Sequence, residues 1–308
     1  MAPTAMNISN RDRGLEIFAS EGGSMGERPR RCAPRTISFV AVLLLLIGGC
    51  TDLAEVTQFA KASQDVGKTF STTADEAEAS CTRANTFINA QNVLDPLPCG
   101  IYPALNPSLV KVNAALFNYI AALGHLASAD ISKTAGGFDS LSTDLKQADP
   151  NISSADQAKA SAAAGLAKAI TNLWATGYRE KELSKIIGEN DQAVQQVTDF
   201  LANYAAHKYA QSFKDEWRYE KAYCENMKAA AEPLATDLLL RKCGSDQYRI
   251  DTQSKAVKSY QGALATIAAT HAKLNQERGH WTTQQLAKDL GPEIVSLGNA
   301  AVSVNKAF

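Results

Sequence analysis

The stretch DLAEVTQFAKASQDVGKTFSTTADEAEASCTRANTFINA, residues 52–90, decides the fold class. Its apolar and small residues recur at alternating steps of four and three, at Val56, Ala60, Ser63, Gly67, Phe70, Ala74, Ala77, Cys81, Ala84 and Ile88. These steps place residues on one face of an α-helix, whereas a half-buried strand needs alternation with period two. At 1.5 Å per residue, we expect one long helix of about 60 Å here.

The same spacing continues along the rest of the chain. Helical patterns cover residues 108–149, 151–190, 191–231, 234–242, 247–278 and 282–305. Ser108 and either Asn151 or Ser153 are the expected N-caps, because their side chains can accept a hydrogen bond from the first turn. No run of strand length with period two occurs after residue 51. The sequence therefore predicts an all-α fold, an elongated bundle of long antiparallel helices.

Proline and glycine mark the expected interruptions of this pattern. Residues 91–107 contain four prolines, which predicts an irregular connection. Gly291 and Pro292 predict a kink or a split in the last helical stretch, since proline lacks the backbone N–H that a helix interior needs.

Composition bounds the function classes. The 308 residues include 45% hydrophobic residues, enough for a packed core. Aromatic residues make up only 7% while alanine is frequent, which favours close-packed helices over sheets. Lys plus Arg number 31 against 32 Asp plus Glu, and a formal charge of −1 gives no electrostatic reason to expect nucleic-acid binding.

The first fifty residues have the order of a secretory signal. Four arginines between residues 28 and 35 precede the apolar run 37–47, which ends at Gly48, Gly49 and Cys50. The run is too short for a membrane-spanning helix, which needs about 20 apolar residues. Acidic residues make residues 1–24 a poor signal region, so we expect 25–49 to be the true signal and 1–24 a dispensable extension.

The end of this signal, Ile47-Gly48-Gly49-Cys50, resembles the lipobox of bacterial lipoproteins. The resemblance implies cleavage between Gly49 and Cys50 and attachment of acyl chains, such as palmitate, to Cys50. Two or three acyl chains anchor a protein stably, whereas one chain does so marginally. Residues 50–308 would then be a single bundle domain in the cell envelope, facing the periplasm. Thr51 after the lipidated cysteine favours the outer over the inner membrane.

The remaining cysteines suggest two disulfides. Cleavage removes Cys32 and lipidation uses Cys50, which leaves Cys81, Cys99, Cys224 and Cys243 in an oxidising compartment. Three pairings are possible, and we favour Cys81 with Cys99 and Cys224 with Cys243, because each pair brackets a chain reversal marked by proline. The rival, a four-cysteine zinc site, usually shows a Cys-x-x-Cys spacing that is absent here.

Catalytic motifs are weak in this chain. Residues 62–69, ASQDVGKT, match a permissive phosphate-binding loop, but Ala62 replaces its first glycine and helical periodicity runs through it. Glu277 and His280 form a single Glu-x-x-His, whereas a di-metal bundle site needs two such pairs. We therefore predict no catalytic residue, no metal site and no cofactor, and enzymatic activity stays open but disfavoured.

Aromatic and charged residues are most concentrated between residues 200 and 223. Tyr204, His207, Phe213 and Trp217 form a candidate cleft for a ligand or partner. The plainer interpretation, which we favour, is that aromatic residues at helical spacing fill the core of the bundle.

Two functions are favoured, ahead of a hydrolase for which no motif speaks. The first is a non-catalytic module of the envelope that binds another protein, and the second is a periplasmic ligand-binding or sensory bundle. An exposed apolar surface would favour the first, whereas an enclosed cavity of several hundred Å³ would favour the second.

Overall fold

A computed structural model describes residues 53–91, 95–128, 141–172, 179–230 and 232–308. The chain divides into two units, Met1–Cys50 and Thr51–Phe308, and the described residues all belong to the second. These residues form an all-α bundle of long helices and contain no strand, as the sequence predicts. The signal segment, with Gly49 and Cys50, lies outside them.

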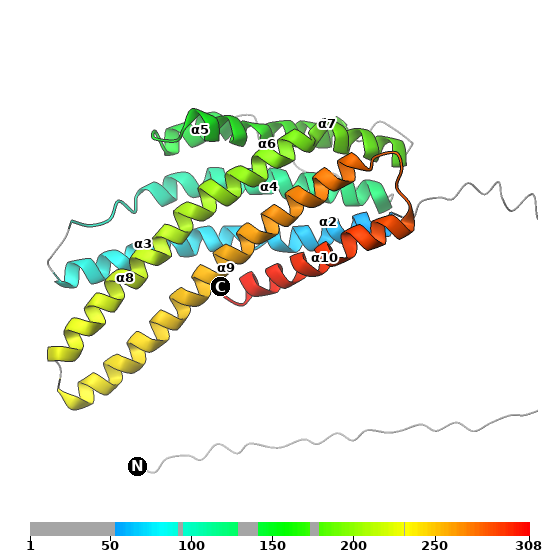
Figure 1. Cartoon of the computed structure of the whole chain (residues 1–308). Helices are drawn as coiled ribbons and strands as arrows, with labels where there is room; N and C mark the ends of the chain where they lie inside the picture. Colours follow the sequence, from blue (N-terminus) through cyan, green and yellow to red (C-terminus); the bar gives the residue numbers. More distant parts are fainter. Residues whose placement is uncertain (1–52, 92–94, 129–140, 173–178, 231) are drawn as a thin grey trace, which may run out of the picture. The chain divides into compact units, whose positions relative to one another are not determined.

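Figure 1 shows the helices of this bundle in chain order. They are α2 (Ala54–Gly67), α3 (Phe70–Gln91), α4 (Ile101–Ser128), α5 (Leu141–Ala148), α6 (Ser154–Asn172), α7 (Arg179–Phe200), the π-helical η3 (Leu201–Ala205), α8 (Ala206–Ala230), α9 (Pro233–Gln276) and α10 (Thr283–Asn305). With 44 residues, α9 is the longest. At 1.5 Å per residue it spans about 66 Å.

The apolar helix α4 lies at the centre of the bundle. It packs against α2, α3, α5, α6 and α7, while α10 packs on α2 and α9. Within the described residues, α4 is the one helix long and apolar enough to cross a membrane, but 67% of its apolar stretch is buried by protein. That burial is typical of the core helix of a bundle.

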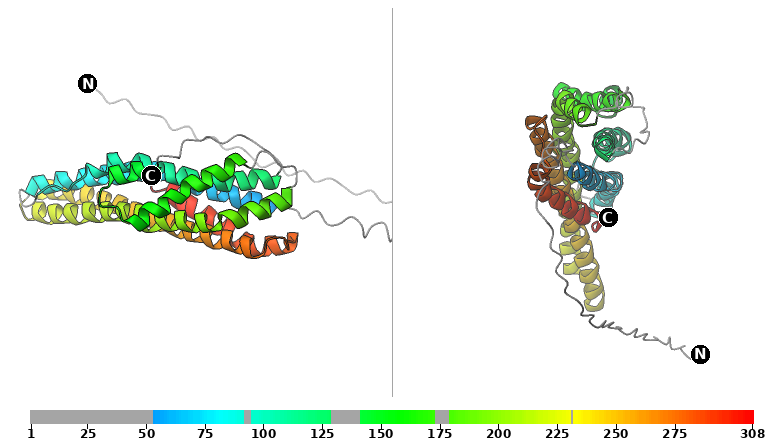
Figure 2. Two further views of the ribbon diagram at one scale, coloured as in Figure 1. Left: turned by 90° about the horizontal axis from the view of Figure 1, so that it is seen from above. Right: turned by 90° about the vertical axis from the view of Figure 1, so that its right-hand side faces the viewer.

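The two ends of the bundle differ. The start of α2 lies at one end, beside the turn from α9 to α10, and the turn from α8 to α9 lies at the other (Figures 1 and 2). At this second end, α3, α8 and α9 run side by side, and the ring of Phe87 of α3 lies 5.6 Å from that of Tyr223 of α8 in a tilted arrangement.

All ten residues of the stripe over residues 52–90 are buried, as their spacing predicts. The prediction of one unbroken helix is wrong, however, because the chain turns at Lys68 and Thr69 between α2 and α3. A Cβ atom on Gly67 would lie 2.4 Å from the ring of Phe117, so α2 ends where a residue without a side chain lets α4 approach.

The irregular connection over 91–107 is also shorter than expected. Helix α4 begins at Ile101 and contains Pro103 and Pro107, and Ser108 is buried inside it rather than capping it. Pro103 lies in the first turn, where the missing N–H has no helical partner to lose. Pro107 is exposed, so water can solvate the carbonyl group that it leaves unpaired.

Two further breaks predicted from the sequence do not occur. Residues 234–242 and 247–278 join in the continuous α9, and α10 passes through Gly291 and Pro292 without a split. Pro292 is exposed, like Pro107. The N-cap at Ser153 is confirmed, because its hydroxyl accepts a 3.0 Å hydrogen bond from the backbone N–H of Asp156.

Both predicted cysteine pairs are at disulfide distance. The sulfur atoms of Cys81 and Cys99 lie 1.99 Å apart, and those of Cys224 and Cys243 lie 1.94 Å apart. The Cys81–Cys99 pair links the segment before α4 to α3. The Cys224–Cys243 pair joins α8 to α9 on the bundle side of the turn between them.

Buried polar side chains fix how the core helices meet. Asn113 of α4 donates a 3.0 Å hydrogen bond to the carbonyl oxygen of Gly67 and accepts a 2.8 Å bond from the buried Tyr260 of α9. Seven residues earlier, Asn106 repeats this arrangement with the carbonyl of Ala74 and the hydroxyl of Tyr209. Each asparagine thus joins α4 to two other helices: Asn113 to α2 and α9, and Asn106 to α3 and α8.

Candidate functional site

The structure does not gather the four predicted site residues into one cleft. Phe213 is fully buried, His207 is exposed, and Trp217 is 41% exposed with the Lys221 ammonium 4.9 Å from its ring centre. The half-buried Tyr204 donates a hydrogen bond to the carboxylate of Asp149. The core interpretation therefore fits Phe213, and the others lie in separate surroundings.

Asp149 explains the position of Tyr204. Burial alone would raise the pKa of this carboxyl, but hydrogen bonds from Tyr204 and Lys208 outweigh it and lower the pKa. The Lys208 ammonium lies 3.1 Å from the carboxylate. The group is a satisfied ion pair that ties the connection between α5 and α6 to η3 and α8.

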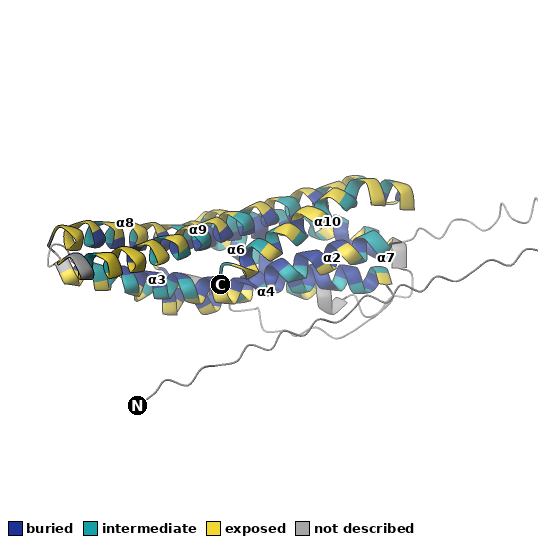
Figure 3. Cartoon of the chain, turned by 90° about the horizontal axis from the view of Figure 1, so that it is seen from below, coloured by how far each residue is buried: buried dark blue, intermediate teal, exposed yellow. Residues whose placement is uncertain are grey.

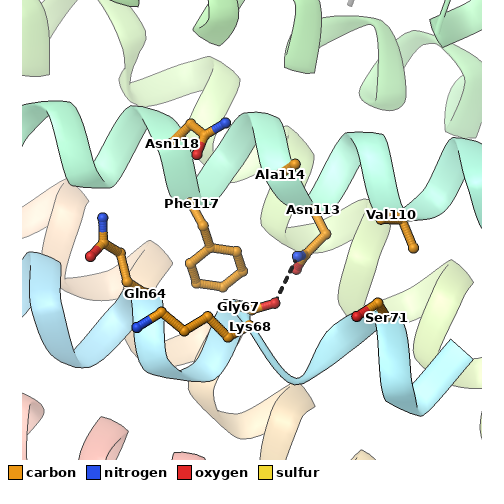
Figure 4. A pocket seen from close by; sticks show the side chains of 9 residues that line it. All are labelled: Gln64, Gly67, Lys68, Ser71, Val110, Asn113, Ala114, Phe117 and Asn118. Carbon is orange, nitrogen blue, oxygen red and sulfur yellow. Dashed lines mark hydrogen bonds between the residues drawn. The ribbon is translucent and has the colours of Figure 1, made fainter. Parts of the chain in front are cut away.

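A groove of about 340 Å³ lies where α2 gives way to α3 (Figure 4). Its lining alternates polar and apolar side chains: Gln64, Gly67, Lys68 and Ser71 from α2 and α3, and Val110, Asn113, Ala114, Phe117 and Asn118 from α4. It is open to solvent rather than enclosed.

This groove includes the end of the phosphate-loop-like sequence, but not its geometry. Residues 62–67 are helical, whereas phosphate-binding loops connect a strand to a helix. The Lys68 ammonium pairs with Asp65 at 2.8 Å instead of facing an anion site. The sequence match is thus a coincidence of helical residues.

A buried polar chain that sequence reasoning missed connects α7, α9 and α4. The His271 Nδ1 atom lies 2.8 Å from the Asp191 carboxylate, and its Nε2 atom lies 3.0 Å from the Tyr119 hydroxyl. His271 is fully buried, and this desolvation lowers its pKa despite the nearby Asp191. A neutral imidazole without access to solvent supports packing rather than acid–base catalysis.

The strongest charge cluster joins α3, α8 and α9. Glu216 is fully buried, and its carboxylate accepts hydrogen bonds from Arg83 at 2.5 and 3.1 Å and from Arg249 at 2.7 Å. Burial alone would raise the pKa of Glu216, but the two guanidinium groups outweigh it and lower the pKa. Glu76 and Gln253 complete the cluster.

One helical turn further along α8, Glu220 has the opposite environment. It is 1% exposed, and neither of its carboxylate oxygens has a hydrogen-bond partner. Burial, followed by the negative charges of Asp246 and Glu216, raises its pKa to about 7, although Arg249 and Lys242 oppose this shift. A carboxylate oxygen of Glu220 and the sulfurs of Cys224 and Cys243 all lie within 4.8 Å of one another. The disulfide already engages both sulfurs.

Beyond this disulfide the bundle narrows to the tip of the α8–α9 hairpin, which we define as residues 224–243. None of its described side chains between the two cysteines is buried, and exposed residues dominate this end of the chain (Figure 3). Met227, Leu238 and Leu240 are 38%, 63% and 45% exposed. Among the side chains that the structure describes here, the tip therefore exposes apolar groups and buries none.

Comparisons of the chain with protein-family models, with curated proteins and with solved structures find no match. The site must be interpreted from its own chemistry.

Proposed function

We propose that this chain is a lipid-anchored protein of the bacterial cell envelope, whose bundle faces the periplasm and binds another protein without catalysis. The observation that supports this proposal is the tip of the α8–α9 hairpin, where none of the described side chains between the two cysteines is buried. Two helices without a buried core gain little from folding by themselves, since most helical stability comes from packing an apolar face. A protein that covers Met227, Leu238 and Leu240 would supply that packing.

The position of the tip agrees with an anchor at Cys50. In the sequence, only residues 51–53 separate Cys50 from the start of α2 at Ala54. Because the tip is at the opposite end of the bundle, acyl chains on Cys50 would leave it pointing away from the membrane. Thr51 makes the outer membrane the favoured one.

The alternative, a periplasmic ligand-binding or sensory bundle, has less support. The groove between α2, α3 and α4 is open to solvent, and its lining mixes polar and apolar side chains without enclosing a cavity. Small-molecule sites are usually concave and mostly apolar, and they bury most of their ligand.

The anchor is tested by Cys50→Ala in the full-length precursor. We expect the variant to lose metabolic labelling with an alkyne fatty acid and to accumulate uncleaved, because Cys50 is the acylated residue. Cys32→Ala is the matched control and should keep both labelling and processing, since cleavage removes that residue. Labelling that persists without Cys50 would contradict the anchor.

The docking surface is tested with a photo-crosslinking amino acid at Leu238 in living cells. Val295 of α10 is the matched control, because both side chains are 63% exposed. We expect one adduct of discrete mass from position 238 and none from position 295. The same adducts from both positions, or none from the tip, would remove the support for a docking surface there.

A further inference from the structure

The Glu220 carboxyl and the Cys224–Cys243 disulfide form a compact group that the proposed docking function does not use. Glu220 lies one helical turn before Cys224, and α9 brings Cys243 against both. Their oxygen and sulfur atoms lie within 4.8 Å of one another. The group is located where three packed helices give way to two.

While the disulfide is intact, the Glu220 carboxyl has no hydrogen-bond partner. A buried polar atom without a partner is destabilising, and both oxygens of Glu220 are of this kind. A disulfide has no hydrogen to donate to them. The two thiols formed by reduction would each have an S–H group, which is a donor that this carboxyl lacks in the disulfide state.

We propose that Glu220, Cys224 and Cys243 form a thiol–disulfide exchange site for a dithiol reductant, in which Glu220 is the proton donor to the departing sulfur. A thiolate of the reductant attacks one cysteine sulfur and forms a mixed disulfide, while the Cys224–Cys243 bond breaks. Its electron pair leaves on the other cysteine sulfur, which takes the proton of the Glu220 carboxyl. The second thiol of the reductant loses its proton to solvent and, as a thiolate, displaces the first cysteine from the mixed disulfide, so that the reductant ends as a disulfide. Solvent then protonates the released cysteine and restores the Glu220 proton.

The distances suit such a transfer. A separation of up to 4.8 Å is longer than a hydrogen bond. The two sulfurs move apart when their bond breaks, however, and one water molecule can bridge a gap of this size. Cys224 and Cys243 are 8% and 6% exposed, so a small thiol can approach the edge of the site.

The charges around Glu220 set the pH range of the reaction. Glu216 lies on its own helix, Lys242, Asp246 and Arg249 lie on α9, and Arg83 of α3 is bound to Glu216. With its pKa raised to about 7, Glu220 holds its proton in mildly acidic solution. Proton transfer from Glu220 to a cysteine thiolate is then thermodynamically favourable, because the ordinary pKa of a cysteine thiol is about 8.5.

The test measures how fast dithiothreitol reduces each disulfide of the folded protein, with alkylation and peptide mass spectrometry to separate them. The variants are Glu220→Gln, an isosteric change without a transferable proton, and Glu225→Gln, an exposed glutamate beside Cys224. At pH 6 we expect Glu220→Gln to slow reduction of Cys224–Cys243 at least about 10-fold, a modest share of general acid catalysis. By pH 8.5 the ratio to wild type should fall within about twofold, because Glu220 has then lost its proton.

The Cys81–Cys99 disulfide is an internal control in every sample. It should be reduced at the same rate in all three proteins, and Glu225→Gln should match wild type at both disulfides. A ratio that does not change with pH would assign Glu220 a packing role and overturn the proposal. Equal slowing of both disulfides, or no slowing at pH 6, would also overturn it.

A second measurement verifies the titration independently of the reductant. Since the raised pKa of Glu220 favours its neutral form in the fold, its contribution to stability is lost as pH rises from about 4.5 through about 7. Glu220→Gln should therefore unfold like wild type near pH 4.5 and be the more stable protein above pH 7. Stability curves that stay parallel across this range would contradict a Glu220 proton with a pKa near 7.

Discussion

Replacing both Arg83 and Arg249 by methionine is expected to lower the free energy of unfolding by about 3–5 kcal/mol at pH 7. Methionine keeps an apolar chain of similar length, so the main change is the loss of the two cations that neutralise the buried Glu216 carboxylate. An unpaired charge in this position must either remain buried at high cost or take up a proton on folding. Urea unfolding of the bundle domain measures the loss.

The pH dependence of the same variant gives a second, sharper result. In the wild type the lowered pKa of Glu216 contributes stability that is present above about pH 4.5 and is lost as pH falls through the lower pKa of the folded state. Without the arginines, burial raises this pKa, so the variant should instead become less stable as pH rises above about 4.5. Removing Arg249 also takes a cation from Glu220 and acts in the same direction.

Arg241→Met is the control for this experiment. Arg241 pairs with Asp237 at 3.0 Å, but both side chains are exposed. Such pairs on a helix surface contribute about 0.3–0.5 kcal/mol. A loss of this size in the double arginine variant as well would mean that Glu216 does not depend on its two partners.

Asn113→Ala is expected to lower the free energy of unfolding by about 2–4 kcal/mol, because it removes two buried hydrogen bonds at once. The Tyr260 hydroxyl loses its acceptor in the core, and the Gly67 carbonyl loses its donor where α2 ends. Thermal and urea unfolding measure the effect, with Asn118→Ala as the control on the same helix. Asn118 lines the open groove and is only partly buried, so its loss should cost less than about 0.5 kcal/mol.

A second substitution separates the two bonds. Adding Tyr260→Phe to Asn113→Ala removes the hydroxyl left without an acceptor, and should restore about 1 kcal/mol. In the wild-type background the same Tyr260→Phe change should be destabilising. If both effects had the same sign and size, the hydroxyl and the amide would not be coupled.

Periodicity was sufficient to predict the class of fold and the buried face of its first helices. Val56 and Ile88 lie on one buried stripe although the helix between them is broken, because a short turn at Lys68 preserves the direction of the face. The pairings of Cys81 with Cys99 and of Cys224 with Cys243 are local in sequence, and proline-marked reversals indicated them.

The errors and omissions have physical causes. The identity of a proline does not reveal its exposure: Pro107 and Pro292 lie on exposed faces, where a lost helical hydrogen bond costs little. The charge cluster could not be predicted, because Arg83 and Glu216 are 133 residues apart. Glu220 gave no sequence signal either, since its lack of partners depends on the packing of three helices.

The π-helical segment Leu201–Ala205 changes the phase of a continuous helical run. Its wider turn absorbs about one extra residue, which rotates everything after it by roughly 100° relative to a regular α-helix. Before the segment the inward face of α7 meets α4, α6 and α9, and after it the inward face of α8 meets α3 and α9. One continuous run of helix from α7 to α8 thus packs against two different sets of helices without a loop. The half-buried Tyr204 lies in the π-helical segment, where the buried face changes from one side of the helix to another.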